Sequence, residues 1–145
     1  MPGIIDTNLL LYAVNTDARE HRRAQQFLTA SLSTNSVWYL TDGIIYEFLR
    51  VSTHARVFSH PLRWNQALSV IDALRQRENV TVLTAGADHW SILEQSLPKL
   101  RHPSGNIFFD IRTYVIMLEY SISTIYTADT DFLQFKGIRV VNPMA

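Results

Sequence analysis

The sequence predicts an α/β fold with a parallel sheet, on the basis of three observations. Short apolar runs alternate along the chain with longer segments whose apolar residues recur at three- and four-residue spacing. Such alternation of strand and helix is typical of a parallel sheet with helices on both faces. The 145 residues are enough for one buried core, and no composition shift, long linker or internal repeat divides them. We therefore expect a single domain over residues 1–145.

Five short apolar runs are the expected strands. They are GIID (3–6), SVWYL (36–40), VTVL (80–83), STIYT (123–127) and IRVV (138–141). Between them, apolar periodicity predicts helices at 18–32, 42–54, 62–76, 87–97 and 106–120, and TNLLLYAV can form a further helix directly after the first strand. The segment LPKLRHPSGN (97–106) is expected to be a long loop because Pro and Gly interrupt it.

The composition excludes several classes of site. The chain has no Cys, which excludes disulfides, thiolate metal sites and a Cys nucleophile, and its five His lack the spacing of a zinc site. The motifs GxxxxGKS/T, GxGxxG and GxSxG do not occur. The net charge is zero, so no overall basic field indicates nucleic acid, although acids gathered in one site would leave the remaining surface basic. Without a signal-peptide pattern or an apolar run of ~20 residues, we expect a cytoplasmic protein with no membrane span.

Three acids lie at the ends of expected strands. Asp6 ends the first strand, and Asp129 and Asp131 follow the fourth in the segment TADTDF (127–132). Each also has a purely structural interpretation, since Asp6 can cap the following helix and Asp129 and Asp131 can be turn residues. In a doubly wound sheet, however, ligands bind at the carboxyl ends of the strands, where the strand order reverses. We therefore expect these acids to face one site.

Two further acids lie on apolar helices. Glu47 is flanked at helical spacing by apolar residues, and Asp110 belongs to a helix that is apolar almost all round and is expected to be central. Glu47 can instead be a surface carboxylate paired with Arg50. Asp110 can instead be a first-turn acid that interacts favourably with the helix dipole, or a buried partner of Arg112 or Tyr114. Because all these acids lie at strand ends or on apolar helices of one predicted α/β fold, a shared site is favoured.

A shared site of this kind predicts a metal ion. Clustered carboxylates repel one another and raise one another's pKa unless a cation neutralises them. Oxygen donors without Cys or paired His indicate a hard ion, Mg²⁺ or Mn²⁺. Such an ion keeps several waters and leaves room for a phosphate oxygen, so the pattern predicts metal-assisted hydrolysis of a phosphodiester.

The opening IIDTNLLLYAV, Glu47, Asp110 and TADTDF together resemble the PIN domain, and the ending IRVVNPM is similar to the VapC-type toxins of bacterial toxin–antitoxin systems. The resemblance covers residues 3–143 and implies a three-layer α/β/α fold with a five-stranded parallel sheet. It also implies an endoribonuclease that depends on Mg²⁺ or Mn²⁺, acts on tRNA or another structured RNA, is inhibited by a small cognate antitoxin and forms a homodimer.

The resemblance also assigns site residues. By motif, the catalytic acids are Asp6, Glu47, Asp110 and Asp129, the metal ligands are Asp6, Asp110 and Asp129, and the supporting polar residues are Asn8, Thr127 and Asp131. We expect Asp129 to contact the metal, and Asp131 mainly to fix the loop through hydrogen bonds to the backbone or Thr127, where the chain begins a short helical turn.

One segment departs from the family pattern. Where the family has small residues after the third acid, this chain has IRTYVIM (111–117). We expect Ile111, Arg112 and Tyr114 to crowd the packing behind the site and so to change helix position, dimer contacts or substrate fit.

Two other functions fit the same acids. One is a PIN-like module that holds RNA or a protein without cutting, for which the bulky IRTYVIM segment is the only indication. The other is a different metal-dependent phosphoryl hydrolase on a similar sheet. Asp6-Thr7-Asn8 disfavours the second, because it lacks the second acid of an Asp-x-Asp nucleophile motif.

Three features concern partners. The basic segment AREHRRAQ (18–25), with Arg19, Arg22 and Arg23, is either a solvated face or a surface that positions phosphates. The three Trp are expected in the core rather than as stacking platforms for RNA bases. An amphipathic antitoxin segment is expected in a groove beside the helix of Glu47, because that helix has more apolar positions than one buried face needs: Ile44, Ile45, Phe48 and Leu49.

Overall fold

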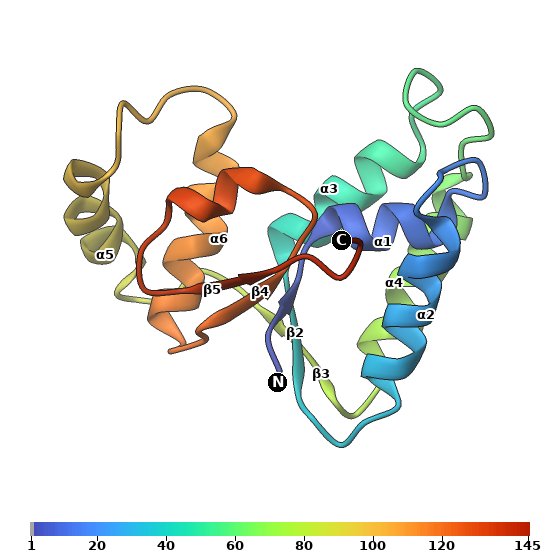
Figure 1. Ribbon diagram of the computed structural model, residues 1–145, viewed down its shortest axis with the longest axis horizontal. Coiled ribbons are helices and arrows are strands. Elements are labelled where there is room, and N and C mark those ends of the chain that lie inside the picture. Colours follow the sequence, from blue (N-terminus) through green and yellow to red (C-terminus); the bar gives the residue numbers. More distant parts are fainter. Residues whose placement is uncertain (1) are drawn as a thin grey trace.

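The computed structural model describes residues 2–145 and contains a five-stranded, fully parallel sheet (Figure 1). The strands follow the order β3-β2-β1-β4-β5. Their bounds are β1 (Ile4–Ile5), β2 (Trp38–Thr41), β3 (Val80–Leu83), β4 (Thr124–Tyr126) and β5 (Arg139–Val141). All five expected strands are therefore confirmed, together with their parallel arrangement.

Six α-helices connect these strands within the described residues. They are α1 (Thr7–Val14), α2 (His21–Leu32), α3 (Asp42–Ser52), α4 (Trp64–Arg75), α5 (His89–Ser96) and α6 (Ile107–Glu119). Two 3₁₀ helices, η1 (Leu97–Lys99) and η2 (Thr130–Gln134), follow α5 and β4, and η2 is the helical turn expected in that region. The helix expected from residue 18 begins later, at His21, because turns at Ala18 and His21 precede it.

The helices cover both faces of the sheet, as expected for an α/β/α arrangement. The general preference for right-handed crossovers predicts α1 to α4 on one face and α5, α6 and η2 on the other. Figure 1 shows α5 and α6 on the opposite side of the sheet from α2 and α4. The direction of strand order reverses between β1 and β4, so the switch point lies at the carboxyl ends of these two strands.

The bulky segment 111–117 after Asp110 is buried, apart from the half-buried Arg112. Ile111 is fully buried in the core, and the Tyr114 ring stacks on Phe135 with centroids 4.7 Å apart. The Tyr114 hydroxyl donates to the Lys136 carbonyl at 2.7 Å. Arg112 instead leaves the core and reaches α3, as described below.

Two expectations about apolar residues were wrong. Trp38 is buried as expected, but Trp64 and Trp90 are exposed, because each lies in the first turn of a helix that begins in solvent. The apolar residues of α3 are not in excess, since Ile44 and Phe48 are buried and the other two pack against the core. A cavity does lie beside α3, with Ile44 in its wall, and is described with the site below. A groove beside α3 as the place where an antitoxin docks stays a prediction. An apolar groove lies elsewhere, between α1, α2 and α4, with a volume of about 300 Å³.

None of the helices in the described part of the chain has the length and apolar character that a membrane crossing requires.

Candidate active site

Asp6 lies at the switch point, directly after β1. Its backbone N–H donates to the Tyr126 carbonyl of β4 at 3.0 Å, and its side chain is only 8% exposed. One carboxylate oxygen accepts from the Thr7 N–H at 2.8 Å and caps α1. The structural interpretation of Asp6 as a helix cap is thus correct, and the same residue also faces the cavity described below.

Thr127 is the centre of a hydrogen-bond network around Asp6. Its hydroxyl donates to the second Asp6 oxygen at 2.8 Å and accepts from the Asn8 amide at 2.9 Å and from the Asp129 N–H at 3.0 Å. Asn8 also donates to Asp6 at 3.3 Å and accepts from the Ala128 N–H at 3.1 Å. These contacts tie the end of β1 to the loop after β4, so the carboxylate of Asp6 has little freedom to rotate.

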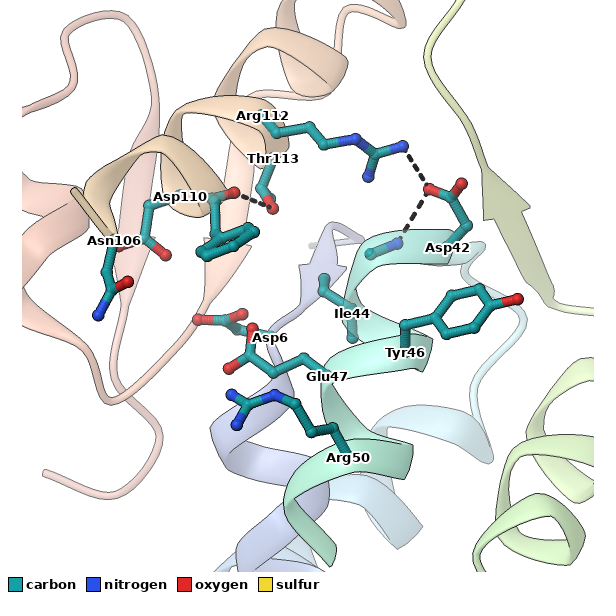
Figure 2. Close-up of a pocket in the computed structure, with 12 residues that line it drawn as sticks. Asp6, Asp42, Ile44, Tyr46, Glu47, Arg50, Asn106, Asp110, Arg112 and Thr113 are labelled. Carbon is teal, nitrogen blue, oxygen red and sulfur yellow. Dashed lines mark hydrogen bonds and ion pairs between the residues drawn. The ribbon is translucent and has the colours of Figure 1, made fainter. Parts of the chain in front are cut away.

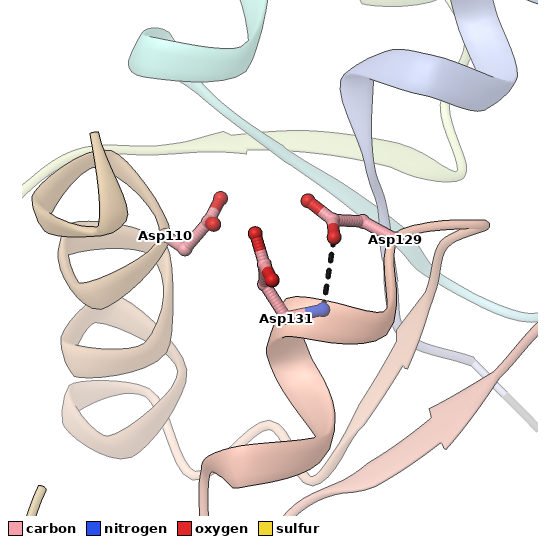
Figure 3. A group of neighbouring side chains, drawn as sticks. All are labelled: Asp110, Asp129 and Asp131. Atoms are coloured by element: carbon pink, nitrogen blue, oxygen red, sulfur yellow. Dashed lines mark hydrogen bonds between the residues drawn. The ribbon is translucent and has the colours of Figure 1, made fainter. Parts of the chain in front are cut away.

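Asp110, Asp129 and Asp131 form a cluster of carboxylates (Figure 3). One oxygen from each lies within 4.8 Å of the others. The Asp129 carboxylate caps η2 by accepting from the Asp131 N–H at 2.9 Å. The side chain that fixes the loop is therefore that of Asp129, whereas we expected Asp131, and the Asp131 carboxylate points toward Asp110 instead.

The four expected catalytic acids line one cavity. Asp6, Glu47, Asp110 and Asp129, with Asn8, surround a space of about 280 Å³. A larger adjoining cavity of about 790 Å³ shares three of these acids and extends between α3 and α6. Figure 2 shows the Asp6 and Glu47 carboxylates side by side, with Asp110 entering from α6 on the other side.

Burial and, to a lesser extent, the neighbouring carboxylates raise the pKa values of three acids. Burial raises the pKa of Asp6 to about 6, against the effect of its hydrogen bonds from Thr127 and Thr7. Burial, followed by the charges of Asp129, Asp6, Asp131 and Glu47, raises the pKa of Asp110 to about 7. Partial burial also raises the pKa of Glu47, which the Arg50 charge lowers. A cation among these groups would relieve both the burial penalty and the mutual repulsion.

The alternative pairings considered for the helix acids do not form. Arg112 is an ion-pair partner of Asp42 at 2.7 Å, and Tyr114 bonds a backbone carbonyl, so neither contacts Asp110. Glu47 and Arg50 form no ion pair within 4.0 Å among residues 2–145.

The sequence did not indicate a role for Tyr46 or Phe109, which line the larger cavity. Its wall includes Tyr46, Phe109, Arg50 and the Arg112–Asp42 pair. The one available signal was position, since Tyr46 and Phe109 each immediately precede an acid. The basic segment 18–25 contributes no residue to either of the two acidic cavities, and its Arg23 donates to the Met144 carbonyl at 2.8 Å.

Comparison with known proteins identifies the family of the chain. The PIN domain model matches residues 4–138. Ribonuclease VapC33 of Mycobacterium tuberculosis is 34% identical over 141 residues, which are 97% of each chain. Ribonuclease VapC48 of the same organism is 26% identical and covers 100% of this chain and 99% of its own.

Solved structures share the fold. VapC20 of Mycobacterium tuberculosis, described as a Sarcin-Ricin loop cleaving toxin, superposes with a TM-score of 0.70 at 20% identity and covers 98% of this chain and 100% of its own. VapBC2 of Rickettsia felis, bound to a promoter DNA fragment, has a TM-score of 0.67 at 16% identity and covers 98% of both chains. With the family model matched over residues 4–138, which is most of the chain, this chain belongs to the PIN-domain family.

Proposed function

We propose that this chain is an endoribonuclease that acts as the toxin of a toxin–antitoxin pair and hydrolyses RNA phosphodiester bonds. The observation that carries the proposal is the convergence of Asp6, Glu47, Asp110 and Asp129 on one cavity at the switch point of the sheet. The family match and two curated relatives named as VapC ribonucleases support the reaction class. We further propose tRNA or another structured RNA as the substrate.

The acids fit a divalent cation. The donors of the site are all carboxylate oxygens, those of Asp110, Asp129 and Asp131 lie within 4.8 Å of one another, and oxygen-only sites suit Mg²⁺ or Mn²⁺. We assign Asp6, Asp110 and Asp129 as the residues that hold the ion, with Asp131 beside them. When bound, such an ion offsets the negative charge of the phosphate and promotes the deprotonation of water.

The remaining residues have separate tasks in this proposal. Asn8 and Thr127 hold the Asp6 carboxylate in one orientation through the bonds given above. Asp129 is fixed by the cap that it provides to η2. Glu47 reaches the same cavity from α3, and we assign it to proton transfer with the attacking water, since its pKa is raised.

We also propose a small antitoxin as partner, a homodimer as the assembly and the cytoplasm as the compartment. The groove between α1, α2 and α4 is the surface we assign to the antitoxin. Its lining is mostly aliphatic and suits the apolar face of an amphipathic helix. The lining residues are Leu10, Ala13, Val14, Leu28, Leu32, Val70, Ala73, Leu74 and Arg77.

Cleavage of RNA by the purified chain tests the function. The chain, freed of any antitoxin, should cut structured RNA with Mg²⁺ or Mn²⁺ and stop when a chelator is added. Asp6→Asn and Asp110→Asn should each abolish cutting and leave the circular dichroism spectrum unchanged, whereas Asp88→Asn, at an exposed position outside both acidic cavities, should cut normally.

Three outcomes contradict the proposal. Cleavage that resists a chelator excludes the metal. RNA that is retained but never cut indicates a binding module. Turnover of a small phosphate ester without turnover of RNA indicates a different phosphoryl hydrolase.

A further inference from the structure

Two aromatic side chains stand unusually exposed beside the acids. Tyr46 is 74% exposed and Phe109 is 70% exposed, although both belong to helices that pack on the core. Each directly precedes a cavity acid in the sequence, Tyr46 before Glu47 on α3 and Phe109 before Asp110 on α6. Both line the cavity of about 790 Å³. The two helices that carry catalytic acids therefore each present an aromatic ring at the same cavity.

The charges around these rings suit part of a nucleotide chain. Arg50 lies one helical turn beyond Tyr46, lines the same cavity and makes no ion pair with any other residue in the range 2–145 (Figure 2). The other guanidinium of this cavity, Arg112, is held by Asp42. Although its charge also acts on Glu47, the Arg50 guanidinium can contact a phosphate, and the adjacent rings can contact bases.

Base stacking can add to RNA binding at this cavity whether or not a cation offsets the charge of the acids. The chain has no net charge, and the floor of the cavity is lined by carboxylates that repel phosphates. Stacking of a base on an aromatic ring does not depend on that charge. Base stacking can therefore contribute binding free energy at this cavity without being weakened by the negative charge of the acids.

We infer that Tyr46 and Phe109 stack on unpaired RNA bases next to the bond that is cut and so position the strand in the cavity. The inference rests on the proposed function and adds two residues that hold its substrate. Within a duplex the faces of the bases are already stacked, so the rings can contact only bases that have left the helix. Arg50 contacts a phosphate of the same segment.

The experiment measures RNA binding without cutting. The full chain carrying Asp6→Asn, with Mg²⁺ present, is titrated against a fluorescent unstructured oligoribonucleotide and against the same sequence in a duplex. Replacing Tyr46 or Phe109 by Leu keeps apolar bulk and removes the ring, and should weaken binding to the unpaired strand about tenfold or more. Tyr46→Trp and Phe109→Tyr, which keep a ring, should restore it.

Two matched controls use rings of the same exposure outside the cavity. Trp64 is 74% exposed and Trp90 is 69% exposed, and neither lines the cavity. Trp64→Leu and Trp90→Leu should leave the dissociation constant unchanged. The inference would be overturned if the Tyr46 and Phe109 variants bound the unpaired strand as tightly as the Trp controls do. It would also be overturned if these variants lost as much affinity for the duplex as for the unpaired strand.

Two further measurements distinguish base stacking from a contact between copies of the chain and from the cutting activity itself. If light scattering shows that the Leu variants convert a dimer into monomers, the rings belong to an interface between copies and the inference is wrong. Cutting by the wild-type chain is measured independently. If the wild-type chain cuts RNA but the Leu variants bind RNA as tightly as the parent chain, the stacking is refuted and the proposed function stands. If binding depends on the rings but the wild-type chain does not cut RNA, the proposed function is refuted and the stacking stands.

Discussion

The Arg112 guanidinium donates to the Asp42 carboxylate at 2.7 Å and so joins α6 to the first residue of α3 (Figure 2). Arg112 follows Asp110 by two residues, and Asp42 precedes Glu47 by five. The same guanidinium lies over Gly43, where an added Cβ would be 2.7 Å from an Arg112 nitrogen. The pair thus connects the two helices that bring Asp110 and Glu47 to the cavity. Arg112 belongs to the segment IRTYVIM, which departs from the family pattern.

Loss of this ion pair should reduce catalysis more than stability. The two side chains are 33% and 40% exposed, so Arg112→Ala should change the free energy of unfolding by no more than about 1 kcal/mol. Because the pair fixes two helices that carry acids, kcat should fall about tenfold, as for residues that support catalytic groups, with little change in RNA affinity.

Gly43→Ala tests the same contact with both charges kept, because its methyl group displaces the guanidinium. Gly43→Ala should lower kcat, as Arg112→Ala does. Arg75→Ala is the control, since it removes a surface pair with Asp72 at 3.4 Å and should have no effect on cutting. Wild-type kcat in both Arg112→Ala and Gly43→Ala would show that the pair does not position the acids.

The metal-free chain should lose stability as the pH rises. Asp6 and Asp110 have pKa values of about 6 and about 7 in the fold, against ~3.9 in an unfolded chain. The folded state therefore binds more protons between these values, and its stability is full below about pH 4 and declines up to about pH 7. Bound Mn²⁺ favours the ionised carboxylates and should oppose this decline.

Thermal unfolding at several pH values between about 5 and 8, with chelator or with Mn²⁺, measures the effect. The melting temperature in chelator should fall across this range, and the increase caused by Mn²⁺ should be largest at the high end. Asp110→Asn should flatten the profile in chelator, whereas Asp88→Asn should not. A melting temperature in chelator that rises with pH contradicts the coupling of these acids.

Thr127→Val should damage both the fold and the site. Valine has nearly the same shape but leaves Asp6, Asn8 and the Asp129 N–H without the hydroxyl that they share. Thr127 is 1% exposed, so these groups have little access to water, and the expected cost is about 1–3 kcal/mol of unfolding free energy. Cutting should fall ~10- to 100-fold, because the metal ligand Asp6 loses its support.

Thr127→Ser keeps the hydroxyl and is the matched control. Denaturant unfolding and cutting rates for the two variants separate the hydroxyl from the side-chain volume. If Ser and Val behave alike, the hydrogen-bond network around Asp6 is not what holds the carboxylate.

The sequence predicted the parts of the site that depend on local pattern. Asp6 and Asp129 follow apolar strands, and a parallel sheet brings the carboxyl ends of its strands to one edge, so their proximity could be predicted. The Asp42–Arg112 pair could not, since 70 residues separate its members and no periodicity connects them. Nor could the exposure of Phe109, because α6 is apolar almost throughout and only the packed structure shows which of its residues the core covers.

The groove between α1, α2 and α4 should be needed for neutralisation and not for cutting. Ala73 lines this groove and is exposed, so Ala73→Glu places a charge in the groove without disturbing the core. Purified Ala73→Glu should cut RNA normally, but coexpression with the antitoxin should no longer relieve growth arrest, because burying a carboxylate against the apolar face of the antitoxin opposes docking.

Ala30→Glu is the matched control, since Ala30 is an exposed residue of α2 that does not line the groove. It should be neutralised normally. Neutralisation of Ala73→Glu equal to that of Ala30→Glu would show that the antitoxin docks at another surface.

Asp129 and Asp131 should differ in their contribution to cutting. Both carboxylates belong to the cluster with Asp110, but only Asp129 also lines the cavity with Asp6 and Glu47. Asp129→Asn can still accept from the Asp131 N–H through its amide oxygen, so the loop is kept while the charge is lost. The variant therefore isolates the role of Asp129 as a ligand, and it should be inactive at any Mn²⁺ concentration.

Asp131→Asn removes a charge from the more exposed edge of the cluster and leaves every hydrogen bond of the loop in place. It should retain activity ~10- to 100-fold below wild type, recover partly as Mn²⁺ is raised, and melt at the wild-type temperature in chelator. Cutting rates and calorimetric Mn²⁺ affinities for both variants decide between the two acids. An inactive Asp131→Asn beside an active Asp129→Asn with unchanged Mn²⁺ affinity would reverse the assignment and make Asp131, which points toward Asp110, the ligand.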